Sequence, residues 1–175
     1  MSWSLRLGSI AGIGIFVHWT FSLIIIFVLL LYLGGGQPVG VALTGVLFVL
    51  GVFVCVVLHE LGHALWARRY GIHTRDIILL PIGGVARLER MPEKPKEEFL
   101  VAMAGPAVNV VIAAILFLLL AAFFIPVGGW ERLSDELRVF AGVQEEGVPQ
   151  NHFAMLMWVN LFLVAFNLLP AFPMD

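Results

Sequence analysis

Long runs of apolar residues, separated by short polar segments, dominate this chain. Four of these runs cover residues 15–33, 39–67, 99–125 and 153–172. Each is close to or above the length of about 20 residues that an α-helix needs to cross the hydrocarbon core of a bilayer. Turn-forming residues follow the first run at Gly34 to Pro38, and Pro126 follows the third. The pattern predicts an α-helical polytopic membrane protein with about four transmembrane helices.

A different pattern lies between the second and third runs, within residues 72–90. Thr74 to Leu80 and Gly84 to Leu88 are rich in β-branched and aliphatic residues, and Pro81 and Gly83 lie between them. This predicts a small β-hairpin or sheet associated with the membrane surface. The later segment 127–151 is more polar, and we expect a loop there with a short helix near residues 131–140.

The basic residues predict an orientation. Of the ten Lys and Arg, eight lie either before the first run or between the second and third, and only Arg132 and Arg138 lie elsewhere. Basic residues are enriched on the cytoplasmic side of membrane proteins. We therefore expect a multi-pass protein of the cell membrane whose N-terminus and 68–98 segment are cytoplasmic. The second and fourth runs would then both end at the cytoplasmic face.

Composition supports the membrane interpretation and narrows the partners. The chain of 175 residues is 61% hydrophobic and only 13% charged, whereas soluble domains are about half apolar and a quarter charged. We expect one domain over residues 1–175. The net charge of −2 argues against a nucleic-acid partner. The single cysteine, Cys55, excludes an internal disulfide.

The second run carries His59-Glu60-Leu61-Gly62-His63, an H-E-x-x-H motif. Residues four apart lie on one face of a helix, so His59 and His63 can bind one Zn²⁺ together. Glu60 lies about 100° further round the helix, where it can act as general base towards a water held by the metal. The alternative is a set of polar residues at a solvated helix end. Against this, Ala64 to Ala67 keep the segment apolar beyond the motif.

A catalytic zinc site usually has three protein ligands and one open position. The chain has three aspartates: Asp76 in the predicted hairpin, Asp135 in the outer loop, and Asp175 at the end of the fourth run. In the predicted orientation, Asp175 lies at the cytoplasmic side of the membrane, at a depth similar to that of His59. It follows Pro170 and Pro173, which interrupt a regular helix. It is the favoured third ligand, and a solvated aspartate at a helix end is the alternative.

These motifs resemble the site-2 protease family of intramembrane zinc metalloproteases. The resemblance covers essentially the whole chain. Its motifs are His59 to His63, Ala104 to Asn109, the pattern Asn167-x-x-Pro170-x-x-Pro173-x-Asp175, and the re-entrant segment Pro81 to Ala86. Within the family, the chain looks similar to the six-span subgroup that is often followed by cytoplasmic CBS modules. Because the family pattern continues beyond the aspartate, we expect a chain that is truncated after its fourth span.

The resemblance implies an enzyme that binds one zinc ion through His59, His63 and Asp175 and uses Glu60 as catalytic acid and base. It also implies peptide hydrolysis within single-span regulatory membrane proteins, so the expected partners are such substrates and the lipid bilayer. Asn109 and Asn167 are amides in apolar segments. They are candidate substrate-binding residues, with helix–helix hydrogen bonding as the alternative.

Three other interpretations use the same residues. An intramembrane zinc carrier would place ligands along a path through the bilayer, whereas here they cluster at one end. An inactive pseudoprotease would lack Glu60 or a ligand, and the motif retains both. A membrane-anchored zincin with a soluble catalytic domain would need a longer polar segment after the second run.

Overall fold

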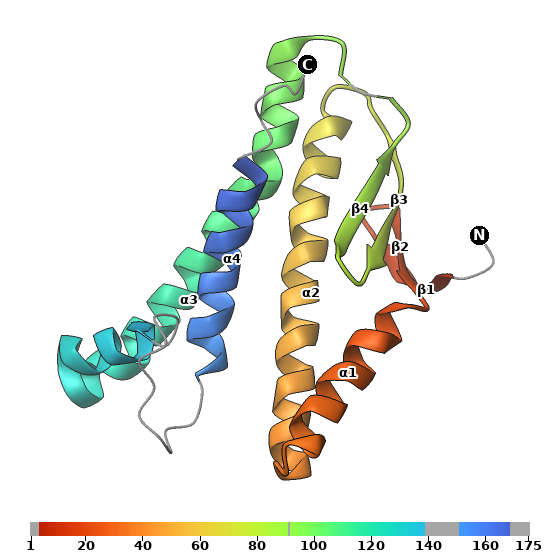
Figure 1. Ribbon diagram of the computed structural model, residues 1–175. Coiled ribbons are helices and arrows are strands. Elements are labelled where there is room, and N and C mark those ends of the chain that lie inside the picture. The colour runs from red at the N-terminus through yellow and green to blue at the C-terminus, as the bar shows by residue number, and fades with distance from the viewer. Residues whose placement is uncertain (1–3, 91, 139–150, 169–175) are drawn as a thin grey trace. The chain divides into compact units, whose positions relative to one another are not determined.

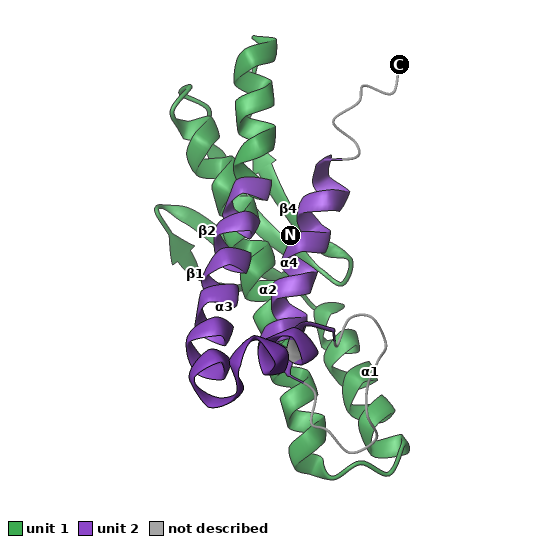
Figure 2. Ribbon diagram, turned by 90° about the vertical axis from the view of Figure 1, so that its left-hand side faces the viewer, with its two compact units in different colours: residues 1–105 green, residues 106–175 purple. Residues whose placement is uncertain are grey.

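The computed structural model describes residues 4–90, 92–138 and 151–168 of the protein (Figure 1). In chain order the elements are strands β1 (Ser4–Ile10) and β2 (Ile13–His18), helices α1 (Phe21–Gly34) and α2 (Val39–Arg68), strands β3 (Thr74–Leu80) and β4 (Gly83–Leu88), and helices α3 (Pro95–Leu137) and α4 (His152–Leu168). The chain divides into two compact units, residues 1–105 and 106–175, which Figure 2 colours separately.

The first unit contains a four-stranded mixed sheet in the order β1-β2-β3-β4. Strands β1 and β2 form an antiparallel hairpin, as do β3 and β4, and β2 pairs in parallel with β3. The turn between β1 and β2 has two residues, Ala11 and Gly12, both with positive φ angles of 52° and 85°. Such two-residue turns match the twist of a β-hairpin. The pairing of β2 with β3 places the N-terminal segment beside the chain that follows α2.

The N-terminal strands correct the predicted first span. A helix was expected from residue 15 to residue 33, but residues 13–18 form β2 and the helix begins only at Phe21. A short apolar run does not by itself distinguish a buried strand from a helix. Here Ile13 and Ile15 are buried, because β3 pairs with β2 and α2 covers the sheet. The predicted hairpin at residues 72–90 is confirmed as β3 and β4, but within a sheet of four strands.

Helix α2 is the centre of the first unit. Helix α1 packs against its beginning, and the two helices meet at the Phe21 and Phe53 rings, which stack edge to face with centroids 4.5 Å apart. Further along, α2 packs against β3 and β4. Ile13, Leu61 and Ile77 form a buried apolar cluster between the helix and the sheet. The end of α2 is therefore covered by the sheet on one side.

The second unit contains the rest of α3 together with α4. Helix α3 was expected to end before Pro126, but it runs on to Leu137 and is interrupted at Gly129, whose φ angle is 67°. The short helix predicted near residues 131–140 is thus confirmed up to Leu137, whereas residues 127–130, predicted as loop, belong to the same interrupted helix; residues 139–150 lie outside the described part of the chain. Leu133, Ala154 and Met157 are buried in one cluster that joins α3 and α4. Packing of this apolar face explains why the helical segment persists beyond the proline.

Two of the described helices, Val39–Arg68 and the Pro95–Asp135 part of α3, are long and apolar enough to cross a membrane. In each, only 17% of the most apolar window is buried inside the protein. Many of the large apolar side chains of these two helices are exposed, which is unfavourable in water and favourable in lipid. Helices α1 and α4 have 14 and 17 residues. The fold is thus mostly helical, with two long apolar helices and a small mixed sheet.

Candidate active site

The H-E-x-x-H motif lies in the last three turns of α2, where the helix is covered by the sheet. His59 is only 5% exposed. The Nε2 atoms of His59 and His63 lie 3.0 Å apart, and the ring planes are inclined at 81°. The helical spacing of four residues thus brings the two imidazole nitrogens to one point, as the sequence predicted.

This arrangement fits a zinc ion. Zinc binds histidine nitrogen at about 2.0–2.1 Å in tetrahedral geometry, so two nitrogens that share one ion lie roughly 3.3 Å apart. The observed separation of 3.0 Å is close to that value. Two nitrogen lone pairs that face each other without a shared proton or cation repel each other. The pair therefore has both the donor chemistry and the spacing of two ligands to one metal ion.

The other ring nitrogen of His63 is held by α3. His63 Nδ1 lies 2.8 Å from the backbone carbonyl oxygen of Val101. A carbonyl oxygen can only accept a hydrogen bond, so Nδ1 must carry the proton and donate it. The lone pair of the neutral ring then lies on Nε2, the atom that faces His59. Such a second hydrogen bond is typical of metal-binding histidines, because it fixes the tautomer and the ring orientation.

Whereas His63 contacts α3, Glu60 contacts strand β4. Its Oε2 accepts a hydrogen bond of 3.2 Å from the backbone N–H of Ala86 in β4. A β-carbon at Gly84 would lie 2.8 Å from Glu60 Cγ, so the glycine allows β4 to approach the carboxylate closely. The carboxylate is therefore held by the sheet while the imidazoles contact α3. This separation is compatible with a base that stands beside a metal ion without binding it.

Not all predicted site residues lie in the described part of the chain. Asp175, the expected third ligand, is outside it, and its role stays a prediction. Within residues 4–90, 92–138 and 151–168, no group of three His, Cys, Asp or Glu side chains is arranged around one point. Of the other two aspartates, Asp76 is engaged by Arg87, whose Nε and Nη2 donate to its two oxygens. This contact holds the pKa of Asp76 below its usual value and provides a structural role for it.

The two candidate amides differ in their surroundings. Asn109 is fully buried in α3, and neither atom of its amide is hydrogen-bonded to any described residue. Asn167 is exposed and donates to the carbonyl of Leu163 in its own helix, at 2.8 Å. A substrate-binding role for either residue remains a prediction. Asn109 is the stronger candidate, because a buried amide that has no partner among the described residues is costly unless another group satisfies it.

Sequence reasoning missed the groups that position the motif. The Ala86 N–H and the Val101 carbonyl are backbone groups, so no side-chain pattern identifies them. A partial signal existed, because Gly83 and Gly84 belong to the segment that resembles a re-entrant strand. What the sequence could not provide was the partner of this segment, which is Glu60.

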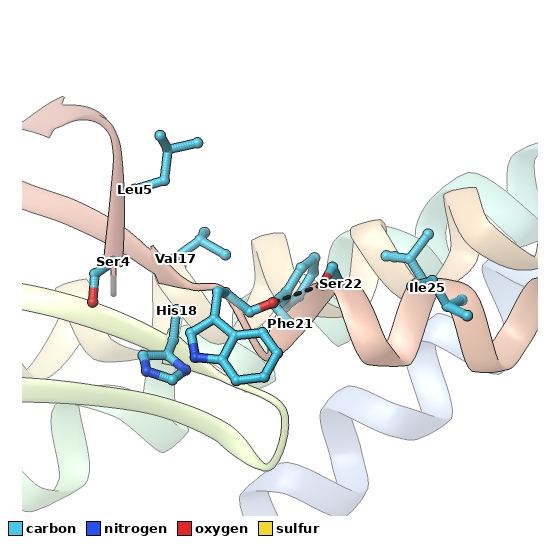
Figure 3. Close-up of a pocket in the computed structure, with 9 residues that line it drawn as sticks. Ser4, Leu5, Val17, His18, Phe21, Ser22 and Ile25 are labelled. Carbon is cyan, nitrogen blue, oxygen red and sulfur yellow. Dashed lines mark hydrogen bonds between the residues drawn. The ribbon is translucent and has the colours of Figure 1, made fainter. Parts of the chain in front are cut away.

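A separate hollow of about 630 Å³ lies at the junction of β2 and α1 (Figure 3). Leu5, Val17 and Ile25 provide part of its apolar lining, and the Ser22 hydroxyl donates to the carbonyl of Trp19 at 2.7 Å. His18 is its one titratable lining residue and hydrogen-bonds through Nδ1 to the Thr20 hydroxyl. Among the described lining residues of this hollow, no carboxylate or second metal ligand accompanies His18, so the hollow offers no candidate catalytic group.

Comparisons with known proteins point to the same chemistry. The profile of peptidase family M50 matches residues 47–175. Over its whole length the chain is 37% identical to a zinc metalloprotease of Methanocaldococcus jannaschii, of which it covers 44%. It is also similar to the stage IV sporulation protein FB of Bacillus subtilis, with 30% identity over 71% of this chain and 35% of that protein. The chain thus spans less than half the length of these curated relatives.

A solved structure shares the fold. The site-2 protease from Methanocaldococcus jannaschii superimposes with a TM-score of 0.67 and 34% sequence identity. The match covers 99% of this chain and 68% of that one. The N-terminal strands, which lie before the segment matched by the family profile, are therefore within the region of structural similarity.

Proposed function

Because the chain belongs to peptidase family M50, the site-2 proteases, we propose that it is the core of a zinc-dependent endopeptidase that cleaves membrane-embedded segments of other proteins. The observation that carries the proposal is the histidine pair, with Nε2 atoms 3.0 Å apart beside a glutamate held on the opposite wall. The names of the similar proteins add the metal and the reaction class.

His59 and His63 would hold one zinc ion, with Asp175 as the third protein ligand. The bound ion would supply Lewis acidity, which polarises a peptide carbonyl and makes water acidic enough to lose a proton near neutral pH. The hydrogen bond from His63 Nδ1 to the Val101 carbonyl supports this assignment, because it places the lone pair of the ring on Nε2, where it can bind the metal.

Glu60 would move the protons of the reaction. Its carboxylate takes a proton from the attacking water and then delivers it to the nitrogen of the leaving amine. Its hydrogen bond with the Ala86 N–H supports this role, because it limits the positions available to the carboxylate. One residue then serves as base in the first step and as acid in the second.

The protein would span the membrane about four times, with its N-terminus and the 68–98 segment in the cytoplasm. Helix α1 has 14 residues, about 21 Å at 1.5 Å per residue, which is shorter than the roughly 30 Å hydrocarbon core. The excess of basic residues on this side of α2 supports the orientation.

Substrates would be single-span regulatory proteins. A helical peptide bond is shielded, so the cleaved segment must unwind, and an extended segment can pair with the free edge of a sheet. Strand β4 is an edge strand that faces Glu60, which makes it a candidate pairing site. Asn109 and Asn167 are candidates for binding the substrate backbone.

The test is cleavage of a panel of single-span reporters in membranes by the full-length protein and by its Glu60→Gln variant. We expect the wild type to cut a reporter within its span. The variant should retain zinc and lose activity by about 10²–10⁴-fold or more, the range that acid–base catalysis contributes. If both proteins bind zinc and neither cuts any reporter, the proposal fails for that panel. Zinc flux in vesicles would then test the carrier alternative.

A further inference from the structure

Gly105 in α3 lies against the face of α2 that carries the histidine pair. A β-carbon built at this glycine would lie 2.7 Å from Nε2 of His59 and closer still to Nε2 and Cε1 of His63. Carbon and nitrogen atoms that are not bonded to each other do not approach this closely. No side chain larger than hydrogen can therefore occupy position 105 while both imidazoles keep their places.

The rings have little freedom to move away. His63 Nδ1 donates to the Val101 carbonyl, one turn before Gly105 on the same helix. Rotating the His63 ring away from a new methyl group would break this hydrogen bond. Val101 itself is 7% exposed and packs in a cluster with Ala67 and Ile72, so the first turns of α3 are also fixed against the end of α2.

The atoms next to Gly105 distinguish it from an ordinary glycine of helix packing. Its nearest neighbours are the imidazole nitrogens that face each other, whereas Gly45 in α2 faces the ring of Tyr32. Gly40, also in α2, has no atom within 4 Å of its built β-carbon. Of these helical glycines, Gly105 alone has the candidate metal ligands as its neighbours.

We propose that the α3 turn from Val101 to Gly105 is the positioning wall of the metal centre. The Val101 carbonyl fixes the tautomer and ring plane of His63, and the absent side chain of Gly105 leaves the space in which the two Nε2 atoms converge. Metal affinity then depends on the docking of α3 against α2. This inference rests on the proposed zinc site, and it adds a second helix that controls how the two histidines bind.

The decisive experiment compares Gly105→Ala with Gly40→Ala in the full-length protein. Each change adds one methyl group to a helix, and the methyl group at Gly40 meets no atom within 4 Å, so this variant controls for the added group itself. The readouts are zinc affinity, measured by competition with a chromophoric chelator, and the visible spectrum of the Co²⁺-loaded protein, which reports ligand geometry. Helix content by circular dichroism in the metal-free state monitors folding.

We expect Gly105→Ala to lower zinc affinity by at least the 10–100-fold typical of lost positioning contacts, with an altered Co²⁺ spectrum and unchanged helix content. Gly40→Ala should behave as the wild type in all three measurements. Wild-type affinity together with a wild-type Co²⁺ spectrum in Gly105→Ala would overturn the inference. A wild type that binds no zinc would instead contradict the proposed function.

A second measurement does not require any variant to fold. In the metal-free wild type, ¹⁵N chemical shifts of labelled histidine report which ring nitrogen carries the proton. We expect the Nδ1–H tautomer for His63, because the Val101 carbonyl accepts from that atom. A His63 ring protonated on Nε2 alone would contradict the positioning role of Val101, whatever the result for Gly105→Ala.

Discussion

The two halves of α2 have similar apolar sequences but different surroundings. The outer half, residues 39–54, packs against α1, and its buried residues are Ala42, Gly45 and Phe53. Leu43 and Leu47 in this half are 52% and 65% exposed. The inner half, residues 55–68, has the sheet on one side and the start of α3 on another. Its buried residues are Cys55, Val56, His59, Leu61, Ala64 and Ala67.

This difference shows what allows polar chemistry on an apolar helix. A charged or polar side chain is expensive in lipid unless protein or water satisfies it. In the inner half, backbone groups of β4 and α3 satisfy Glu60 and His63. The outer half has exposed leucines at positions where lipid is an adequate solvent. The predictions below test whether this covering determines where the site is.

The largest effect should follow from removing a ligand in the inner half. In His63→Ala we expect zinc content to fall to background and cleavage to be lost, because one imidazole and its hydrogen bond to Val101 are both removed. Leu47→Ala in the outer half is the control and should keep both. Metal analysis of the purified proteins provides the measurement. Stoichiometric zinc in His63→Ala would refute its assignment as a ligand.

Core packing should give the next largest effect. Leu61 is 4% exposed and packs against Ile13 and Ile77, so Leu61→Ala should lower the free energy of unfolding by about 2–4 kcal/mol. Leu47→Ala should cost about 0.5 kcal/mol or less, since its side chain faces the surroundings. Unfolding in detergent micelles can be followed by circular dichroism. Equal costs for the two changes would mean that the sheet does not cover the inner half.

Removing the backbone donor to Glu60 should have a moderate effect. Ala86→Pro deletes the N–H that contacts the carboxylate, and because β4 is an edge strand this N–H is not needed for pairing with β3. We expect cleavage to fall roughly 10–100-fold, consistent with a hydrogen bond to a charged group worth about 1.5–3 kcal/mol, with zinc retained. Leu88→Pro, two residues further along β4, perturbs the strand but leaves the Ala86 N–H in place, so a larger loss in Ala86→Pro reports the contact with Glu60. Unchanged cleavage in Ala86→Pro would exclude this edge from both base positioning and substrate pairing.

The smallest expected effect is on the stability of the protein at acid pH, through the ion pair between Asp76 and Arg87 in the sheet. Arg87 holds the pKa of Asp76 below its usual value. A lowered pKa contributes stability above the unfolded value of about 3.9, and this contribution is lost as pH falls through the folded value. Thermal unfolding should therefore show a modest acid loss below about pH 4, and Asp76→Asn should flatten that part of the curve. An identical acid limb in both proteins would show that the ion pair does not contribute.

The sequence identified the chemistry better than the architecture. The spacing of His59 and His63 correctly predicted convergent nitrogens, because helical periodicity determines that geometry locally. The hairpin at β3 and β4 was also predicted from its β-branched residues. The β1–β2 hairpin was missed because Ile13 to His18 continues directly into an apolar helix, and only pairing with β3 distinguishes the two. The walls of the site are contacts between distant segments, and hydrophobic patterns contain no information about such partners.

The parallel pairing of β2 with β3 has a consequence for the order of assembly. Gly14 lies opposite Asp76, so the sheet joins segments about 60 residues apart, with α1 and α2 between them. During synthesis, the first hairpin emerges long before its partner and must wait with an unpaired edge until both helices are in place. Contacts between such distant segments form slowly. The four-stranded sheet that covers the end of α2 can therefore be completed only after both helices have been synthesised.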